Sequence, residues 1–112
     1  MSKLRFFILD QEWTVEKVHS HDANLYVGNE ACIGSMWAAK QAIYISDELS
    51  PERAFRTLIH ELCHAYINAT QAIVPENWSE EAVCDLVSIY AYEIVKKAES
   101  LHRDLYGGSK SE

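Results

Sequence analysis

The chain has 112 residues, of which 48% are hydrophobic and 11% aromatic, so it can bury the modest core of a single domain. Its formal net charge of −7 argues against a nucleic-acid backbone as the main partner. No apolar run approaches the length of a membrane span, and the run near the start is too short for a signal peptide. Three widely spaced cysteines do not suggest a disulfide framework. We therefore expect a reduced, cytoplasmic protein with no membrane partner.

The first half of the chain has the two-residue periodicity of strands. We expect strands over residues 4–9, 13–18, 25–27, 31–33 and 41–46. Asp10-Gln11 gives a weak hairpin signal between the first two, and Gly34 ends the fourth. The last strand has the clearest alternation, with Ile43 and Ile45 on one face and Tyr44 on the other.

The second half of the chain is predicted to be helical. Ser50-Pro51-Glu52 supplies a hydroxyl cap, a proline at the first helical position and an acid in the first turn of a helix that fades near residue 68. Ser79 caps a second helix that reaches about Leu101. We expect an α+β fold in which a small N-terminal antiparallel sheet packs against these two helices. The domain spans residues 1–106, and residues 107–112 form a disordered tail.

The residues that carry chemistry are His60-Glu61-Leu62-Cys63-His64, which spell H-E-x-x-H. On a helix, this spacing places His60 and His64 on one face, about one turn apart, where both imidazoles can bind the same zinc ion. Glu61 points roughly 100° away from His60 around the helix axis. It is therefore the candidate general base for a zinc-bound water.

A catalytic zinc needs a third protein ligand, and the start of the second helix offers carboxylates. We assign Glu81 as that ligand. Asp85, four residues on and on the same helix face, would accept a hydrogen bond from the outer ring nitrogen of His60. The competing assignment makes Glu80 the ligand and leaves Glu81 as an acid that favours the helix start.

The H-E-x-x-H motif, with Glu81 and Asp85 in an E-x-x-x-D pattern on the next helix, resembles the gluzincin zinc peptidases. The layout is similar to short metallopeptidase-like proteins of phages and bacterial mobile elements, related to the ImmA/IrrE family. The resemblance covers roughly residues 28 to 95, and its zinc motif is more specific than its E-x-x-x-D part. The string HELCHA is also similar to SprT-like proteases that act at DNA, but those need a third histidine soon after the motif, and the only later one is His102.

The resemblance implies a zincin-like fold and a zinc metallopeptidase acting on a peptide or protein substrate. His60, His64 and Glu81 would bind Zn²⁺, Glu61 would activate water and Asp85 would orient His60. The strand before the zinc helix, with Ile43, Tyr44 and Ile45, would pair with the substrate as an added strand. The chain departs from larger gluzincins because it ends before the subdomain that stabilises the oxyanion. That departure keeps an alternative open, a non-catalytic regulatory or interaction protein stabilised by zinc.

Overall fold

The computed structural model describes residues 3–71, 76 and 78–107. Over these residues it has the strands β1 (Lys3–Ile8), β2 (Gln11–Val18), β3 (Tyr26–Val27), β4 (Glu30–Ala31), β5 (Gly34–Trp37) and β6 (Ala42–Ser46). Two long helices follow, α1 (Pro51–Thr70) and α2 (Glu80–His102). A short 3₁₀ turn, η1 (Ala23–Leu25), precedes β3, and a π-helical turn, η3 (Arg103–Gly107), follows α2. No helix within the described ranges is long and apolar enough to cross a membrane.

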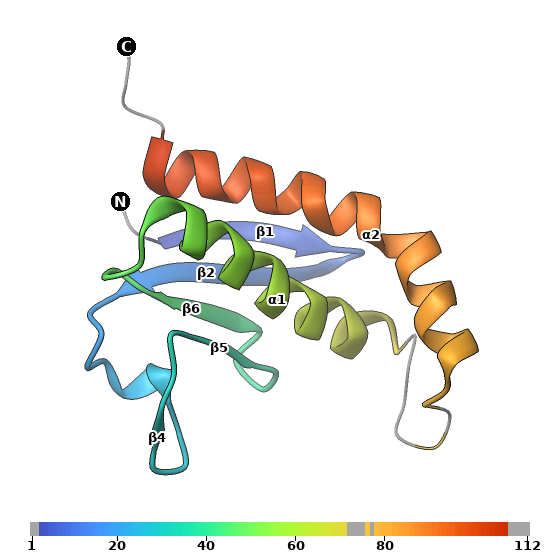
Figure 1. Ribbon diagram of the computed structural model, residues 1–112, viewed down its shortest axis with the longest axis horizontal. Helices are drawn as coiled ribbons and strands as arrows, with labels where there is room; N and C mark the ends of the chain where they lie inside the picture. The colour runs from blue at the N-terminus through green and yellow to red at the C-terminus, as the bar shows by residue number, and fades with distance from the viewer. Residues whose placement is uncertain (1–2, 72–75, 77, 108–112) are drawn as a thin grey trace.

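The α+β class is confirmed, but the main sheet is mixed rather than antiparallel. Its strand order is β1-β2-β6-β5, and β2 and β6 run parallel, with Val15 opposite Ile43. The other two pairings, β1 with β2 and β5 with β6, are antiparallel. Parallel neighbours need a long crossover. Here the chain between β2 and β6 passes through η1, the β3–β4 hairpin and β5 (Figure 1).

Strand β5 is an element that the sequence analysis missed, because Gly34 was interpreted as the end of the preceding strand. The residues that follow it, Ser35, Met36 and Trp37, pair with β6 and form one edge of the sheet. Tyr26–Val27 and Glu30–Ala31, close to two predicted strands, form a separate small hairpin. The result moves the sheet edge from β6 to β5.

Both helices pack on one face of the sheet, with α1 across β5 and β6 and α2 beside it, next to β1 (Figure 1). The side chains that alternate onto this face are fully buried, among them Ile8, Trp13, Val15, Ile43 and Ile45. From α1, Leu58, Leu62 and Tyr66 complete this core. Burying each such side chain contributes about 1.5–3 kcal/mol, so the core fixes where α1 lies on the sheet.

The helix starts follow the prediction. Ser50 caps α1 and its hydroxyl accepts a hydrogen bond from the Arg53 amide at 3.2 Å. Ser79 caps α2, and its hydroxyl accepts from the Ala82 amide at 3.1 Å. Helix α1 ends at Thr70 and is capped by Gln71, whose φ of 57° gives the left-handed conformation. Of the predicted tail, Gly107 closes the last helical turn, and residues 108–112 lie outside the described residues.

Candidate metal and peptide site

The two motif histidines lie one turn apart on α1, as their spacing predicts. The ring centroids of His60 and His64 are 5.0 Å apart and their planes meet at 70°. Both side chains are exposed, so an ion can approach them from solvent. Neighbouring imidazoles on one rigid helix suit the nitrogen coordination of zinc and need little further ordering.

Glu61 lies between helix and sheet rather than in solvent, and it is 8% exposed. Its carboxylate packs against the start of β5, because a Cβ built on Gly34 would lie 3.3 Å from Oε2 of Glu61. Burial raises the pKa of Glu61, and the charge of His60 opposes this shift. A carboxyl group whose pKa is raised holds a proton more readily, which suits a group that must take up and release one.

The neighbouring titratable groups also favour imidazole as the metal ligand. Burial, and then the charge of His60, lower the pKa of His64, so the neutral imidazole that metals require is favoured. Burial raises the pKa of Cys63, so the protonated thiol is favoured at this position. Cys63 instead lines a small apolar cavity of about 130 Å³ between α1 and α2. Of the side chains in the motif, the two imidazoles are thus the ones that could hold a metal ion.

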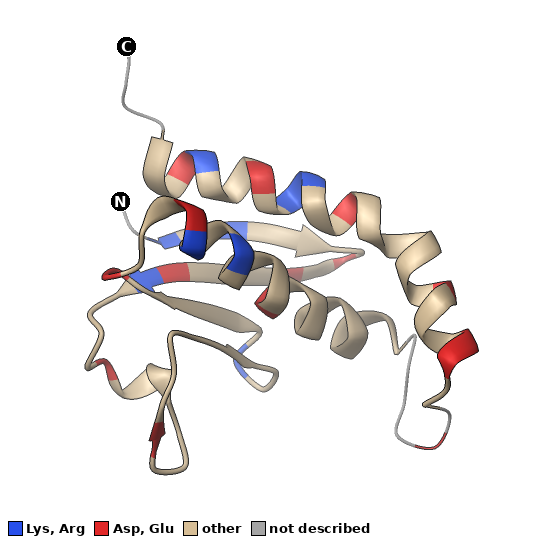
Figure 2. Cartoon of the chain, in the orientation of Figure 1, with Lys and Arg blue, Asp and Glu red and all other residues tan. Residues whose placement is uncertain are grey.

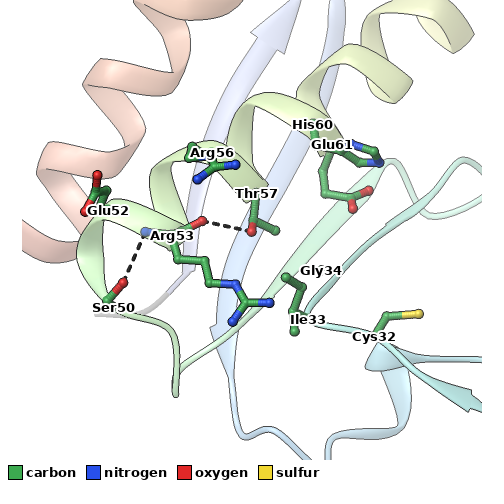
Figure 3. Close-up of a pocket in the computed structure, with 10 residues that line it drawn as sticks. All are labelled: Cys32, Ile33, Gly34, Ser50, Glu52, Arg53, Arg56, Thr57, His60 and Glu61. Carbon is green, nitrogen blue, oxygen red and sulfur yellow. Dashed lines mark hydrogen bonds between the residues drawn. The ribbon is translucent and has the colours of Figure 1, made fainter.

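A pocket of about 550 Å³ opens beside the motif, between the first half of α1 and the start of β5. Figure 3 shows Glu61 reaching into it at one end, next to His60, while Arg53 reaches across from the other end toward Ile33 and Gly34. The pocket is therefore bounded by the candidate general base, a strand edge and an arginine. Those are the elements from which a peptide groove can be built.

The structure does not bring the predicted carboxylates to the histidines. Within the part of the chain that the structure describes, no three His, Cys, Asp or Glu side chains are grouped so that they could hold a metal ion. Glu80, Glu81 and Asp85 are all exposed in the first turns of α2. In Figure 1 these turns lie apart from α1, whereas the rest of α2 lies beside it. Helix α2 lines a cavity with α1 only from Leu86 onward. His60 and His64 thus fit two ligand positions of a zinc site, and the role of Glu81 stays a prediction.

The strand expected to receive the substrate is not available for it. Strand β6 pairs with β2 on one side and β5 on the other, so the prediction that Ile43, Tyr44 and Ile45 bind a peptide backbone is wrong. Ile43 and Ile45 are fully buried in the core beneath the helices. Tyr44 is half-buried on the opposite face of the sheet. The main sheet has two edge strands, β1 and β5, and β5 is the one that lies against α1 beside the motif.

The backbone of β5 has groups that face away from β6. The Ser46 amide donates to the Ile33 carbonyl at 2.9 Å, which makes these two residues a hydrogen-bonded pair. In an antiparallel ladder such pairs alternate, so Ser35 also turns its backbone toward β6. The amides and carbonyls of Gly34 and Met36 are therefore directed to the outer side of the strand, where an added strand would bind.

Gly34, Arg53 and Arg56 are site residues that the sequence analysis missed. The helical period did contain a signal for the two arginines, because they precede His60 by seven and four residues and so share its face. Gly34 had no such signal. Its importance comes from the approach of α1 to β5, which only the tertiary structure reveals.

Searches with this chain found no matching protein-family model, no matching curated protein and no matching solved structure.

Proposed function

We propose that this chain is a zinc-dependent peptidase whose catalytic centre is built on His60, Glu61 and His64. The observation that supports it most is the joint placement of the three side chains. The two imidazoles lie side by side on α1. The carboxylate of Glu61, the residue that follows His60, lies at one end of a pocket that borders a strand edge. A gluzincin-type centre related to the ImmA/IrrE family is part of this proposal.

In the proposed mechanism the two histidines bind the metal ion and Glu61 transfers the proton. His60 and His64 would hold the ion, which when bound supplies a polarised substrate carbonyl and a water of lowered pKa. Glu61 removes a proton from the attacking water as its oxygen bonds to the carbonyl carbon. The same carboxyl group then gives the proton to the amine that leaves when the C–N bond breaks. The raised pKa of Glu61 helps it to carry the proton between these two steps.

Peptide recognition is assigned to β5. The outward backbone groups of Gly34 and Met36 can pair with an extended substrate, as sheet edges do in other peptide-binding proteins. Gly34 packs directly against Glu61, so a peptide bound there lies next to the candidate base. The substrate's main chain would position the cleaved bond, and its side chains would be selected by the pocket.

Glu81 remains the proposed third ligand, with Glu80 as the competing one and Asp85 as the partner of His60. The described arrangement keeps all three away from the histidine pair, so this part of the proposal requires the start of α2 to approach α1. The exposed apolar side chains there, Trp78 and Val83, are consistent with that approach, because it would bury them.

The first experiment measures zinc in purified wild type and in His→Ala variants after dialysis against dilute zinc. Wild type should retain about one ion per chain, and His60→Ala and His64→Ala should lose most of it. His21→Ala, an exposed histidine outside the motif, is the matched control and should retain the metal. Equal zinc in all four proteins would refute the proposed site.

The second experiment separates catalysis from binding. Glu61→Gln should keep the zinc while cleavage of a mixture of quenched fluorescent peptides falls to background. Cleavage that survives in zinc-loaded Glu61→Gln would remove Glu61 from the mechanism. Glu81→Gln and Glu80→Gln, compared for zinc content, decide between the two candidate third ligands.

One observation favours a second candidate function, a non-catalytic protein stabilised by zinc. The described residues offer two protein ligands rather than three. Under this function, zinc raises the melting temperature of wild type and Glu61→Gln equally, and neither protein cleaves any peptide in the mixture. Loss of cleavage confined to Glu61→Gln would exclude it.

A further inference from the structure

The pocket beside the motif contains two cations with no anionic partner in the described part of the chain. Arg53 and Arg56 both line it, and neither guanidinium forms a hydrogen bond or an ion pair with any described residue. The chain has 10 basic and 17 acidic residues, so its arginines have abundant potential partners. Both side chains are exposed, so their guanidinium groups are available to an anionic ligand that enters the pocket.

The acidic side chains of the pocket do not neutralise these arginines. Glu52 lies within the same helical turn as Arg53, but its carboxylate points away from the Arg53 guanidinium in Figure 3. Glu61 lies at the far end of the pocket beside Gly34, and no ion pair joins it to either arginine. Figure 2 shows that the second half of α1, beyond Glu61, carries no charged residue at all. The positive groups of α1 are thus confined to the pocket.

The positions of the arginines relate them to the cleaved bond. Along a helix, Arg56 lies about 6 Å and Arg53 roughly 10 Å before His60. An extended peptide advances about 3.3 Å per residue, so these guanidinium groups lie roughly two to three residues from a bond held at His60. Arg53 also reaches toward Ile33 and Gly34, where a peptide added to β5 would lie (Figure 3).

We propose that Arg53 and Arg56 bind a carboxylate of the peptide substrate and so make the enzyme selective for acidic peptides. The inference rests on the proposed peptidase function and adds its substrate class. The carboxylate belongs to an Asp or Glu side chain, or to the free C-terminus of the peptide, near the cleaved bond. The overall charge of −7 repels acidic ligands at long range, so the preference must come from these local groups.

The test measures equilibrium binding rather than cleavage, so it does not depend on the catalytic step. Zinc-loaded Glu61→Gln is titrated, by fluorescence anisotropy, into labelled hexapeptide mixtures that differ at one residue position or in the C-terminal group. One mixture has Glu there and an amidated C-terminus, the second has Gln and an amidated C-terminus, and the third has Gln and a free carboxylate. The comparison identifies which carboxylate is bound.

The Glu mixture or the free-carboxylate mixture should bind about fivefold to tenfold more tightly than the neutral one. This preference should disappear in a double variant that carries both Arg53→Gln and Arg56→Gln. Arg5→Gln is the matched control: Arg5 lies on β1, at the other edge of the sheet, where it pairs with Glu12 at 3.3 Å. The control makes the same change of charge and should retain the full preference.

Three outcomes would overturn the inference. The neutral mixture could bind as well as both acidic ones, or Arg5→Gln could abolish the preference as completely as the pocket variants do. A short single-stranded DNA could also displace the acidic peptides through the same two arginines, which would identify a phosphate ligand. A protein that binds acidic peptides through Arg53 and Arg56 yet cleaves none would retain the carboxylate-binding site while refuting the peptidase function.

Discussion

Gly34 on β5 and Thr57 on α1 are so close that no larger residue fits at position 34. A Cβ added to Gly34 would lie 2.6 Å from the Cγ2 methyl of Thr57, inside any normal contact distance. The Thr57 hydroxyl is held in place by its bond to the Arg53 carbonyl at 2.9 Å. This contact brings the strand edge within reach of Glu61, and the proposed site depends on it.

Gly34→Ala should therefore separate α1 from β5. We expect a loss of about 1–3 kcal/mol in the free energy of unfolding, as for other overpacked contacts, measured by urea denaturation. Adding Thr57→Ser removes the clashing methyl and keeps the hydroxyl, so the double variant should recover most of the loss. A Gly34→Ala protein as stable as wild type would show that the close approach does not exist.

Tyr66→Phe should weaken the attachment of α2 to α1. The fully buried Tyr66 donates its hydroxyl proton to Oε2 of Glu93 at 2.7 Å, and this bond joins the two helices. The exposed Glu93 can be hydrated once the bond is lost, so the expected cost is about 1 kcal/mol. A double-mutant cycle with Glu93→Ala, followed by thermal unfolding, isolates the pair, and a coupling energy near zero would contradict the contact.

Tyr106→Phe should keep or increase the stability of the protein, unlike Tyr66→Phe. The Tyr106 hydroxyl is buried without a hydrogen-bond partner among the described residues, while its ring stacks on His102 with centroids 4.9 Å apart. Removing only the hydroxyl keeps the stacking and relieves an unsatisfied polar group. Unfolding at neutral pH should show a variant at least as stable as wild type, by up to about 1 kcal/mol.

The pH dependence of the same variant provides a second check. Burial, and then the negative charge of Asp47, raise the pKa of Tyr106 in the folded protein. The protonated tyrosine therefore contributes its full stability below the unfolded pKa of about 10, and this contribution is lost as the pH rises toward the folded pKa. Above about pH 10 wild type should lose stability relative to Tyr106→Phe. A difference between the two proteins that does not change with pH would contradict the shift.

Zinc should order the start of α2 if Glu81 is the third ligand. Residues 80–85 are exposed or half-exposed in the described arrangement, so their amides should exchange hydrogen faster than those near the buried Ile94. Adding zinc should slow exchange over 80–85 in wild type and not in Glu81→Gln. Exchange that zinc leaves unchanged in wild type would exclude a ligand from α2.

The sequence predicted the local features of this protein better than its sheet. Caps such as Ser50 and Ser79 act within a few residues, so both helix starts could be read directly from the chain. The first hairpin turn lies one residue earlier than predicted, because Leu9 adopts a φ of 55°, which leucine rarely does. The parallel pairing of β2 and β6 depends on a long crossover, which a pattern of alternation does not encode.

In the candidate site too, local spacing could be predicted from the sequence and long-range placement could not. Helical spacing was sufficient to place His60 beside His64 and to set Glu61 apart from them. The substrate strand was assigned wrongly because alternation identifies a strand and not its neighbours, and β6 proved to be internal. The place of Glu81 depends on the path between the helices, which no periodicity specifies, and this path includes residues outside the described ranges.

The most direct test of the central claim is zinc K-edge X-ray absorption of the zinc-loaded protein. The account predicts two imidazole ligands at about 2.0–2.1 Å, with oxygen in the remaining positions, and one imidazole in His64→Ala. A spectrum of wild type dominated by sulfur at about 2.3 Å, or one without imidazole scattering, would contradict a metal centre built on His60 and His64.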